Sequence, residues 1–252
     1  MIRRSPLLAS LLCVALMLFG VGSLSPPRVA AADCVAFPET GKSVCGRFLA
    51  YWEANGGLLR QGLPLTDEFS ETNPATGKTY RVQYFERARF ELHPENAPPQ
   101  DVQLGLLGLE QFAVHYPGVL PAVEGDPFAG DVGGRECARF HFTGETVCGP
   151  FLSYWREHGE LAQHGYPISP VFLETNPSNG RQYPTQYFER ARFEFHVGFA
   201  NTPNAVQLGL LGREQLLARY PNGIPGESPV PPTLPSHPPK ASPLPSPGLP
   251  PP

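Results

Sequence analysis

The feature of this sequence that most constrains its fold is an internal duplication. When the chain is slid along itself by 103 residues, positions 34–101 align with positions 137–204 without a gap. One additional residue then shifts the offset to 104 for the rest of the second copy. Self-similarity at a fixed offset marks a structural unit that is repeated along the chain. The sequence therefore predicts two tandem copies of one fold.

Two motifs carry the duplication. The nonapeptide QYFERARFE occurs unbroken at 83–91 and at 186–194, and the pentapeptide LGLLG occurs at 104–108 and at 208–212. Between the copies, residues 118–134 are rich in Gly, Pro and Asp without a period, a composition that is typical of a linker. We therefore expect five parts: a signal peptide at 1–32, repeat 1 at 33–121, a linker at 122–136, repeat 2 at 137–225 and a disordered proline-rich tail at 226–252.

The first 32 residues predict export. Arg3 and Arg4 precede an apolar run at 7–21, and three alanines at 30–32 supply the small residues that a signal peptidase reads. The run is short for a membrane span, which needs roughly 20 residues. An uncleaved membrane anchor is the alternative; we expect cleavage before Asp33 and no membrane span afterwards. The mature chain is then secreted, or held at the cell surface or in the cell wall.

The mature chain is acidic. The full sequence carries 19 Lys and Arg against 23 Asp and Glu, a net charge of −4. Removal of residues 1–32 takes away three arginines and no acids, which leaves 16 against 23, a net charge of −7. Proteins that bind nucleic acid need a basic surface that displaces counterions. The charge therefore argues against nucleic acid and against anionic membrane surfaces as partners.

Four cysteines remain in the mature chain, at equivalent places in the two repeats: Cys34, Cys45, Cys137 and Cys148. Four cysteines allow three pairings, and the duplicated spacing favours one bridge within each repeat, Cys34–Cys45 and Cys137–Cys148. Structural zinc sites use more closely spaced pairs, so we expect disulfides and no metal. In an oxidising compartment such a bridge contributes about 3 kcal/mol.

Within each repeat, the pattern predicts an α+β unit of short helices and a small antiparallel hairpin or sheet with its own small core. Val44, Phe48 and Trp52 recur at helical spacing, and glycines at 56 and 57 follow as a helix end. Trp52 lies on this apolar face, which favours core packing over a platform for a sugar ring. Both repeats share further signals: helix N-caps at Thr66 and Ser169, hairpin turns at 73–77 and 176–180, and second short helices at 110–115 and 214–219.

The order YW, GG, Gly-x-Pro, QYFERARFE and LGLLG resembles the LGFP repeat of bacterial cell-wall-associated proteins. It is more similar still to a longer variant found in exported bacterial proteins of uncharacterised function, over nearly all of residues 34–121 and 137–225. The sequence departs from the LGFP pattern in its cysteines and at Arg87-Ala88, where that family has Asn-Gly. QYFERARFE is therefore either one strand or a hairpin bent at this dipeptide. The resemblance implies binding at the cell surface and supplies no catalytic residues.

The duplication also selects candidate functional residues, because an activity present in each repeat should keep its ionisable groups in both. The pairs that pass are Glu71/Glu174, Glu86/Glu189, Arg87/Arg190, Arg89/Arg192, Glu91/Glu194, His93/His196 and Glu110/Glu214. Alternating charges on a strand often form cross-strand pairs, and this structural interpretation is the first alternative. Arginines that grip a carboxylate ligand are the second, with candidate residues Arg87, Arg89, Glu91, His93, Arg190, Arg192, Glu194 and His196. Acid–base catalysis by Glu86 and Glu91 beside His93 is the third.

Motifs that would identify an enzyme are missing from the sequence: it has no nucleophile elbow, no H-E-x-x-H and no phosphate-binding loop. We therefore expect an exported, non-catalytic tandem-repeat module that binds cell-wall glycan or an extracellular protein, without a cofactor or a metal. Two alternatives stay open. One is an extracellular hydrolase that acts on the wall or another polymer through the Glu/Arg/His cluster, and the other is a structural spacer without a ligand.

Overall fold

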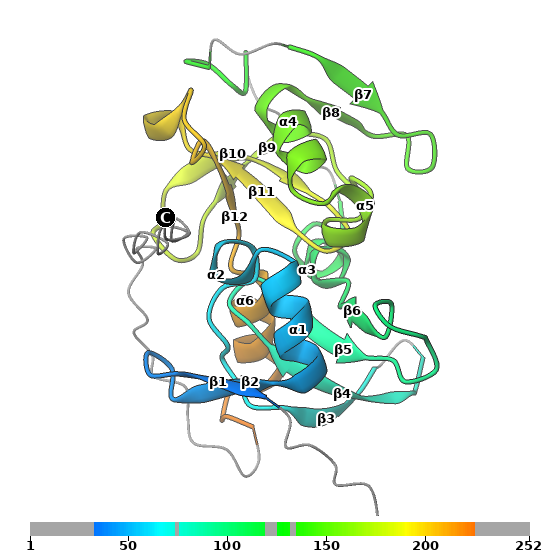
Figure 1. The fold of residues 1–252 in the computed structure, drawn as a ribbon. Helices are drawn as coiled ribbons and strands as arrows, with labels where there is room; N and C mark the ends of the chain where they lie inside the picture. Colours follow the sequence, from blue (N-terminus) through cyan, green and yellow to red (C-terminus); the bar gives the residue numbers. More distant parts are fainter. Residues whose placement is uncertain (1–32, 74–75, 119–124, 132–134, 225–252) are drawn as a thin grey trace, which may run out of the picture. The chain divides into compact units, whose positions relative to one another are not determined.

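The same series of helices and strands occurs twice along the chain (Figure 1). The computed structural model describes residues 33–73, 76–118, 125–131 and 135–224; the predicted signal peptide and proline-rich tail lie outside them. Repeat 1 contains β1 (Cys34–Phe37), β2 (Lys42–Cys45), α1 (Gly46–Ala54), α2 (Gly57–Arg60), β3 (Phe69–Thr72), β4 (Thr79–Tyr84), β5 (Arg89–Leu92), β6 (Val102–Leu104) and α3 (Leu107–His115). Repeat 2 contains β7 (Cys137–Arg139), β8 (Thr146–Cys148), α4 (Gly149–Glu157), α5 (Glu160–Gln163), β9 (Phe172–Thr175), β10 (Gln182–Tyr187), β11 (Arg192–Phe195), η1 (Val197–Phe199), β12 (Val206–Leu208) and α6 (Leu211–Arg219).

Each repeat is built around a four-stranded antiparallel meander, which confirms the α+β prediction. The strand order is β3-β4-β5-β6 in repeat 1 and β9-β10-β11-β12 in repeat 2, and a two-stranded ribbon precedes each meander. Antiparallel neighbours need only short connections. The first connection is the predicted turn, in which Gly77 and Gly180 both have a φ of 70°. Glycine adopts this left-handed conformation without steric cost, so the turn closes as the sequence predicts.

The QYFERARFE segment is a hairpin bent within the motif, not one strand. Tyr84 at the end of β4 pairs with Arg89 at the start of β5. The Phe85 amide closes the bend by donating to the Ala88 carbonyl oxygen at 2.8 Å, and repeat 2 has the same bond at 2.8 Å. On a single strand Arg89 would face solvent, and that interpretation is wrong because Arg89 is buried. The bend brings charged side chains together across two strands.

Thr66 and Ser169 are not helix caps, because no helix begins at either residue in the described chain. The Thr66 hydroxyl accepts a hydrogen bond from the Tyr84 amide at 3.1 Å, and the Ser169 hydroxyl accepts one from the Tyr187 amide at 2.9 Å. A hydroxyl that binds backbone N–H groups serves a turn as well as a cap. The predicted N-caps are therefore wrong, although the hydroxyls do bind backbone amides.

Both predicted disulfides are present. Cys34 bonds to Cys45, and Cys137 bonds to Cys148, each with a Cα–Cα distance of 4.1 Å. In each ribbon the two cysteines are directly opposite one another in the strand register. Each bridge therefore ties the first strand of its repeat to the residue that precedes the first helix.

One face of each meander is covered by the first helix of the same repeat. In repeat 1, the rings of Phe48 and Tyr51 on α1 meet Phe90 on β5 edge-on, with centroids 5.8 and 5.0 Å apart. The Trp52 indole N–H donates to the Gly62 carbonyl oxygen at 3.1 Å, and Trp155 makes the equivalent bond, also at 3.1 Å. Trp155 is buried and Trp52 is half-buried, so both tryptophans pack against their own repeat as expected.

The opposite face of the repeat 1 meander is covered by a helix from repeat 2. Helix α6 packs on β4, and in Figure 1 this orange helix lies among the blue and cyan elements of repeat 1. Leu216 of α6 is part of the buried core of repeat 1. The ring of Tyr220, just after α6, meets Phe69 of β3 at 5.7 Å.

The converse holds for the repeat 2 meander, which is covered by α3 from repeat 1. Phe112 of α3 lies 5.2 Å from the ring of Tyr187, and Tyr116 lies 4.9 Å from Phe172. We call α3 and α6 the exchanged helices. Each repeat has a core cluster of its own, but the exchanged helices and a third cluster of Leu107, Phe172, Tyr187 and Leu211 join the two repeats. The described residues between 33 and 224 belong to one compact unit. A local motif predicts a helix, but it does not specify which of two near-identical sheets the helix covers.

The second glycine of each LGLLG motif permits this exchange. A Cβ atom on Gly108 would lie 1.9 Å from the carbonyl oxygen of Phe188 in the other repeat. The neighbouring Leu109 amide donates to the Glu189 carbonyl oxygen at 3.0 Å, which satisfies one of the amides left open at a helix start. The reciprocal contacts are Gly212 with Phe85 and Arg213 with Glu86. The LGLLG motif of each repeat thus docks on the QYFERARFE bend of the other.

Part of the predicted linker belongs to repeat 2. Phe128 is only 3% exposed, and its ring meets Phe151 of α4 and Phe195 of β11 edge-on at 5.0 and 5.4 Å. The Gly130 carbonyl oxygen accepts a hydrogen bond from the Asn201 side chain at 3.0 Å. The described linker residues 125–131 are therefore packed against the second meander.

Candidate functional site

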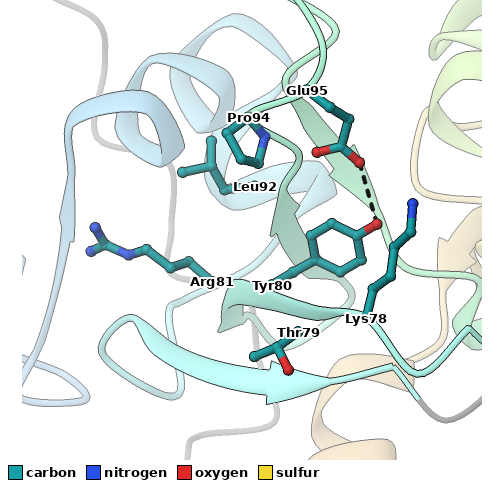
Figure 2. A pocket seen from close by; sticks show the side chains of 7 residues that line it. All are labelled: Lys78, Thr79, Tyr80, Arg81, Leu92, Pro94 and Glu95. Atoms are coloured by element: carbon teal, nitrogen blue, oxygen red, sulfur yellow. Dashed lines mark hydrogen bonds between the residues drawn. The ribbon is translucent and has the colours of Figure 1, made fainter.

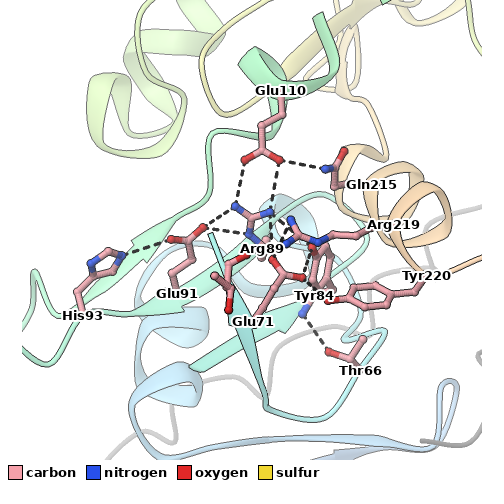
Figure 3. A network of polar contacts seen from close by, with 11 residues as sticks. Thr66, Glu71, Tyr84, Arg89, Glu91, His93, Glu110, Gln215, Arg219 and Tyr220 are labelled. Carbon is pink, nitrogen blue, oxygen red and sulfur yellow. Dashed lines mark hydrogen bonds and ion pairs between the residues drawn. The ribbon is translucent and has the colours of Figure 1, made fainter. Parts of the chain in front are cut away.

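In repeat 1, one buried arginine lies among three glutamates (Figure 3). The Arg89 side chain is 2% exposed, and its Nη2 atom lies 2.6 Å from a Glu91 oxygen and 3.1 Å from a Glu110 oxygen. Its Nη1 atom lies 3.5 Å from a Glu71 oxygen. We call these four side chains the Arg89 cluster. Strands β3 and β5 and the start of α3 supply them, so the cluster joins three elements that are distant in sequence.

Repeat 2 contains the equivalent Arg192 cluster. The Arg192 side chain is also 2% exposed, and its Nη2 atom lies 2.9 Å from an oxygen of Glu194 and 2.9 Å from an oxygen of Glu214. Its Nε atom lies 3.3 Å from a Glu174 oxygen. The first glycine of LGLLG makes room for the guanidinium, since a Cβ on Gly209 would lie 2.6 Å from Nε. Arginine suits such a site because its planar fork presents five donors.

The exchanged helices are tied to both clusters by tyrosines. Glu71 accepts hydrogen bonds from Tyr84 of its own repeat at 2.9 Å and from Tyr220 of the other repeat at 2.8 Å. Glu174 likewise accepts bonds from Tyr187 and Tyr116, both at 2.7 Å. The clusters therefore hold the two repeats together as well as each repeat's own strands.

The surroundings of Arg89 and Glu194 favour their charged forms. Burial by itself lowers the pKa of the Arg89 guanidinium, but the neighbouring Tyr84, Glu110 and Glu91 outweigh it and hold that pKa above its ordinary value. Burial raises the pKa of Glu194, but the neighbouring His196 and Arg192 outweigh that effect and hold the pKa below its ordinary value. A buried ion pair that is fully hydrogen-bonded is costly to break from one side.

The two clusters differ in one cation. Arg219 of α6 places its Nη1 atom 3.4 Å from a Glu71 oxygen and donates from Nη2 to the Thr72 carbonyl oxygen at 2.8 Å. The aligned residue of α3 is His115, whose side chain is exposed. The Arg89 cluster thus has a second arginine beside its three glutamates, which the Arg192 cluster does not have among the contacts of the described chain.

The remaining predicted site residues do not join these clusters into one open site. Arg87 lies at the bend, where its Nη1 atom is 3.6 Å from Glu86 and 3.5 Å from the Leu58 carbonyl oxygen, and Arg190 occupies the equivalent bend. His93 lies at the rim, with Nε2 3.4 Å from Glu91, and His196 lies 3.4 Å from Glu194. Ligand binding by the eight predicted residues stays a prediction, and their contacts here are with one another and with the backbone.

An open surface lies on repeat 1, next to these residues. The Tyr80 pocket has a volume of about 560 Å³ (Figure 2) and is lined by Lys78, Thr79, Tyr80, Arg81, Leu92, Pro94 and Glu95. The Phe48 pocket has a volume of about 440 Å³ and is lined by Ser43, Cys45, Gly46, Arg47, Phe48, Asp67, Glu68, Arg81 and Leu92. Arg81 and Leu92 line both, so the pockets adjoin.

The comparison of ionisable groups between the repeats did not select this surface, because several of its charged residues occur in repeat 1 only. Arg81 aligns with Pro184, Leu92 with Phe195 and Glu95 with Gly198. That comparison keeps only the ionisable groups that both repeats share, and most of these groups form the buried Arg89 and Arg192 clusters. A different sequence pattern indicates the pockets: charged residues of repeat 1 that are replaced by proline or glycine in repeat 2.

The described residues offer no metal site and no membrane span. No three of their His, Cys, Asp or Glu side chains converge as metal ligands. None of their helices is both long and apolar enough to cross a bilayer.

The comparisons with known proteins give no match: no family model, no curated protein and no solved structure is significantly similar to this chain.

Proposed function

We propose that the chain is an exported, non-catalytic binding module that acts at the cell surface or the cell wall, on wall glycan or an extracellular protein. The observation that supports this proposal is the asymmetry between the repeats. Two adjoining pockets lie on the face of repeat 1. Four of their charged lining residues, Arg47, Asp67, Arg81 and Glu95, are replaced by proline or glycine in repeat 2. Repeat 1 is then the binding repeat, and repeat 2 holds it in shape through the exchanged helices.

Binding is favoured over hydrolysis by the state of the duplicated ionisable groups. The hydrolase alternative would use Glu86, Glu91 and His93. Glu86 accepts a hydrogen bond from the Leu63 amide at 3.0 Å, and Glu91 is bonded to Arg89 at 2.6 Å. A general acid or base must reach its substrate with a free proton site, and these groups are engaged by the fold.

The pocket surface has the mixed character of a recognition site. Tyr80 presents a half-buried ring that lies against His93, with centroids 4.1 Å apart, and its hydroxyl donates to Glu95 at 3.3 Å. Arg81 is 61% exposed and is paired with Glu68. Aromatic rings beside a few placed polar groups are typical of ligand sites.

The test is co-sedimentation of residues 33–252 with isolated cell-wall fractions. We expect binding that Tyr80→Ala combined with Arg81→Ala reduces at least tenfold, about 1.4 kcal/mol. The matched control is Tyr183→Ala, because Tyr183 lies against His196 at 4.0 Å as Tyr80 lies against His93. The control should cost similar stability and leave binding unchanged.

Digestion of the fractions separates the two ligand classes. Loss of binding after muramidase treatment assigns a glycan, and loss after protease treatment assigns a protein. Equal loss of binding in the Tyr80 and Tyr183 variants would contradict the assignment of the surface to repeat 1.

A further inference from the structure

Repeat 2 has an occupant at the place where repeat 1 has the Phe48 pocket. Phe128 of the linker packs edge-on against Phe151 and Phe195 and is buried. By the offset of 103, these two residues align with Phe48 and Leu92. Phe48 and Leu92 line the open pocket of repeat 1. The same chain therefore shows one such site filled and the other open.

The occupant in repeat 2 is an aromatic ring held beside a carboxylate. Asp126 accepts a hydrogen bond from the Phe128 amide at 2.9 Å and one from Arg135 at 2.6 Å. Arg135 also donates to the Phe128 carbonyl oxygen at 3.3 Å, and its guanidinium carbon lies 5.9 Å from the centre of the ring. The Phe128 ring and the hydrogen bonds from Arg135 thus hold the short segment Asp126-Pro127-Phe128 in place.

The chain has no equivalent residue for repeat 1. The segment aligned with residues 123–136 is 20–33, and it contains no Phe, Tyr or Trp. Residues 225–252 contain none either. Among the residues that the structure does not describe, Phe19 is the one aromatic, and it belongs to the predicted signal peptide. These segments of the printed sequence thus offer no aromatic occupant for repeat 1, and we assign the occupant to another chain.

Two arginines, Arg47 and Arg81, line the Phe48 pocket together with Asp67 and Glu68. Arg47 and Arg81 align with Pro150 and Pro184. Arg47 is half exposed and uses Nε and Nη2 for Asp101, at 2.7 and 2.5 Å. Arginine has five N–H donors, so both side chains can also bind a carboxylate that accompanies the incoming ring, as Arg135 binds Asp126.

We propose that the Phe48 pocket of repeat 1 docks an extended peptide segment of another protein that presents an aromatic side chain next to a carboxylate. The ring takes the position against Phe48 and Leu92 that Phe128 takes in repeat 2, and Arg47 and Arg81 hold the carboxylate. This inference rests on the proposed binding function and assigns a protein segment as its ligand class.

The test uses the chain's own linker as the probe. A labelled peptide of residues 123–131, VEGDPFAGD, is titrated with residues 33–252 by fluorescence anisotropy. We expect saturable binding that is at least tenfold weaker for the peptide with Phe128→Ala and several-fold weaker with Asp126→Asn. Equal affinity of the Phe and Ala peptides, or no binding of either, would overturn the proposal.

Protein variants locate the site. Arg81→Glu changes an exposed side chain and should weaken peptide binding several-fold. Leu92→Glu should abolish peptide binding, and its Tm shows whether the variant is folded. The matched control is Arg181→Glu, which makes the same charge change on an exposed residue of repeat 2. If all three variants still bind the peptide, the peptide displaces Phe128 from repeat 2. This result would overturn the assignment of the site to repeat 1.

Two further outcomes also count against it. Concentration-dependent self-association of residues 33–252 that Arg81→Glu abolishes would assign the pocket to a second copy, whose Phe142 is 78% exposed. Binding to wall fractions through Tyr80 and Arg81 without any peptide binding would reject this inference and leave the proposed function intact. Peptide binding without wall binding would support the inference and reject the wall as the site of action.

Discussion

Repeat 1 and repeat 2 have the same meander, the same disulfide and the same buried arginine, yet they differ beside the buried cluster and at the Phe48 pocket. In repeat 1 the buried cluster contains a second arginine, Arg219, and the Phe48 pocket is open. For the Arg192 cluster of repeat 2, the residue of α3 that aligns with Arg219 is the exposed His115. Phe128 is packed against the second meander. What the repeats share builds the fold, because the shared charges pair with one another. What they do not share is where we propose that an individual function resides.

The largest expected effect comes from separating the repeats. Residues 33–121 alone lack α6, and with it the buried Leu216 and the Tyr220 hydroxyl bond to Glu71. Loss of one buried leucine costs about 2–5 kcal/mol, out of a total stability of roughly 5–15 kcal/mol. We expect no cooperatively folded monomer; folded material should be a dimer that exchanges α3 between two copies. Light scattering and thermal melts check this, and a cooperatively melting monomer would contradict the exchange.

The next effect compares the two clusters. Arg89→Met and Arg192→Met should each cost about 3–5 kcal/mol, because each leaves buried glutamates without their cation. Arg192→Met should cost more, since Arg219 remains beside Glu71 in the other variant. Urea denaturation of both variants measures the difference. The control is Arg156→Met, whose ion pair with Glu136 is exposed, so its loss should change the stability little. A larger loss of stability in Arg89→Met than in Arg192→Met would contradict the inference that Arg219 partly replaces Arg89 beside Glu71.

A smaller effect depends on pH. His164, buried against Phe193 at 4.8 Å, aligns with Gln61 of repeat 1. Burial, with smaller contributions from His158 and Arg60, lowers the pKa of His164 to about 3. Because the folded-state pKa lies below the unfolded value near 6.5, the protein loses stability as pH falls below 6.5. The loss is about 1.4 kcal/mol for each pH unit until pH 3 is approached.

His164→Gln gives repeat 2 the residue that repeat 1 has at this position, and it should remove the loss of stability at low pH. Thermal melts at pH 7 and pH 5 measure it: the difference in stability between these values should be about 2 kcal/mol smaller in the variant. An unchanged difference would mean that His164 is protonated in the folded protein, or that other groups dominate acid sensitivity.

The sequence predicted the local elements better than their partners. The duplicated cysteine spacing predicted both disulfides, and the Asn-Pro-x-x-Gly turns predicted the first hairpin, because each depends on neighbouring residues. The exchange of α3 and α6 was not predictable. Both meanders offer the same tyrosine and glutamate, and nothing in LGLLG states which copy its helix contacts. The close approach of Gly108 to the other repeat is seen only in the structure.

The candidate site shows the same limit in another form. Arg89 and Glu91 were selected because both repeats keep them, and their burial explains why: three carboxylates and one guanidinium form a network that each sheet needs. Arg81 and Leu92 were not selected, since Pro184 and Phe195 replace them. Their proximity depends on the pairing of β4 with β5, where Arg81 is opposite Leu92, and the alternatives left open for QYFERARFE did not fix that register.

The most direct test of the helix exchange is the sign of the stability change in Gly108→Ala. In an ordinary helix, Gly→Ala stabilises by up to about 1 kcal/mol. Here a Cβ would lie 1.9 Å from the Phe188 carbonyl oxygen of the other repeat, and such overpacking typically costs about 1–3 kcal/mol. Gly198→Ala is the control, because a Cβ there meets nothing within 4 Å. We expect urea denaturation to show Gly108→Ala destabilised and Gly198→Ala unchanged; a stabilised Gly108→Ala would contradict the exchange.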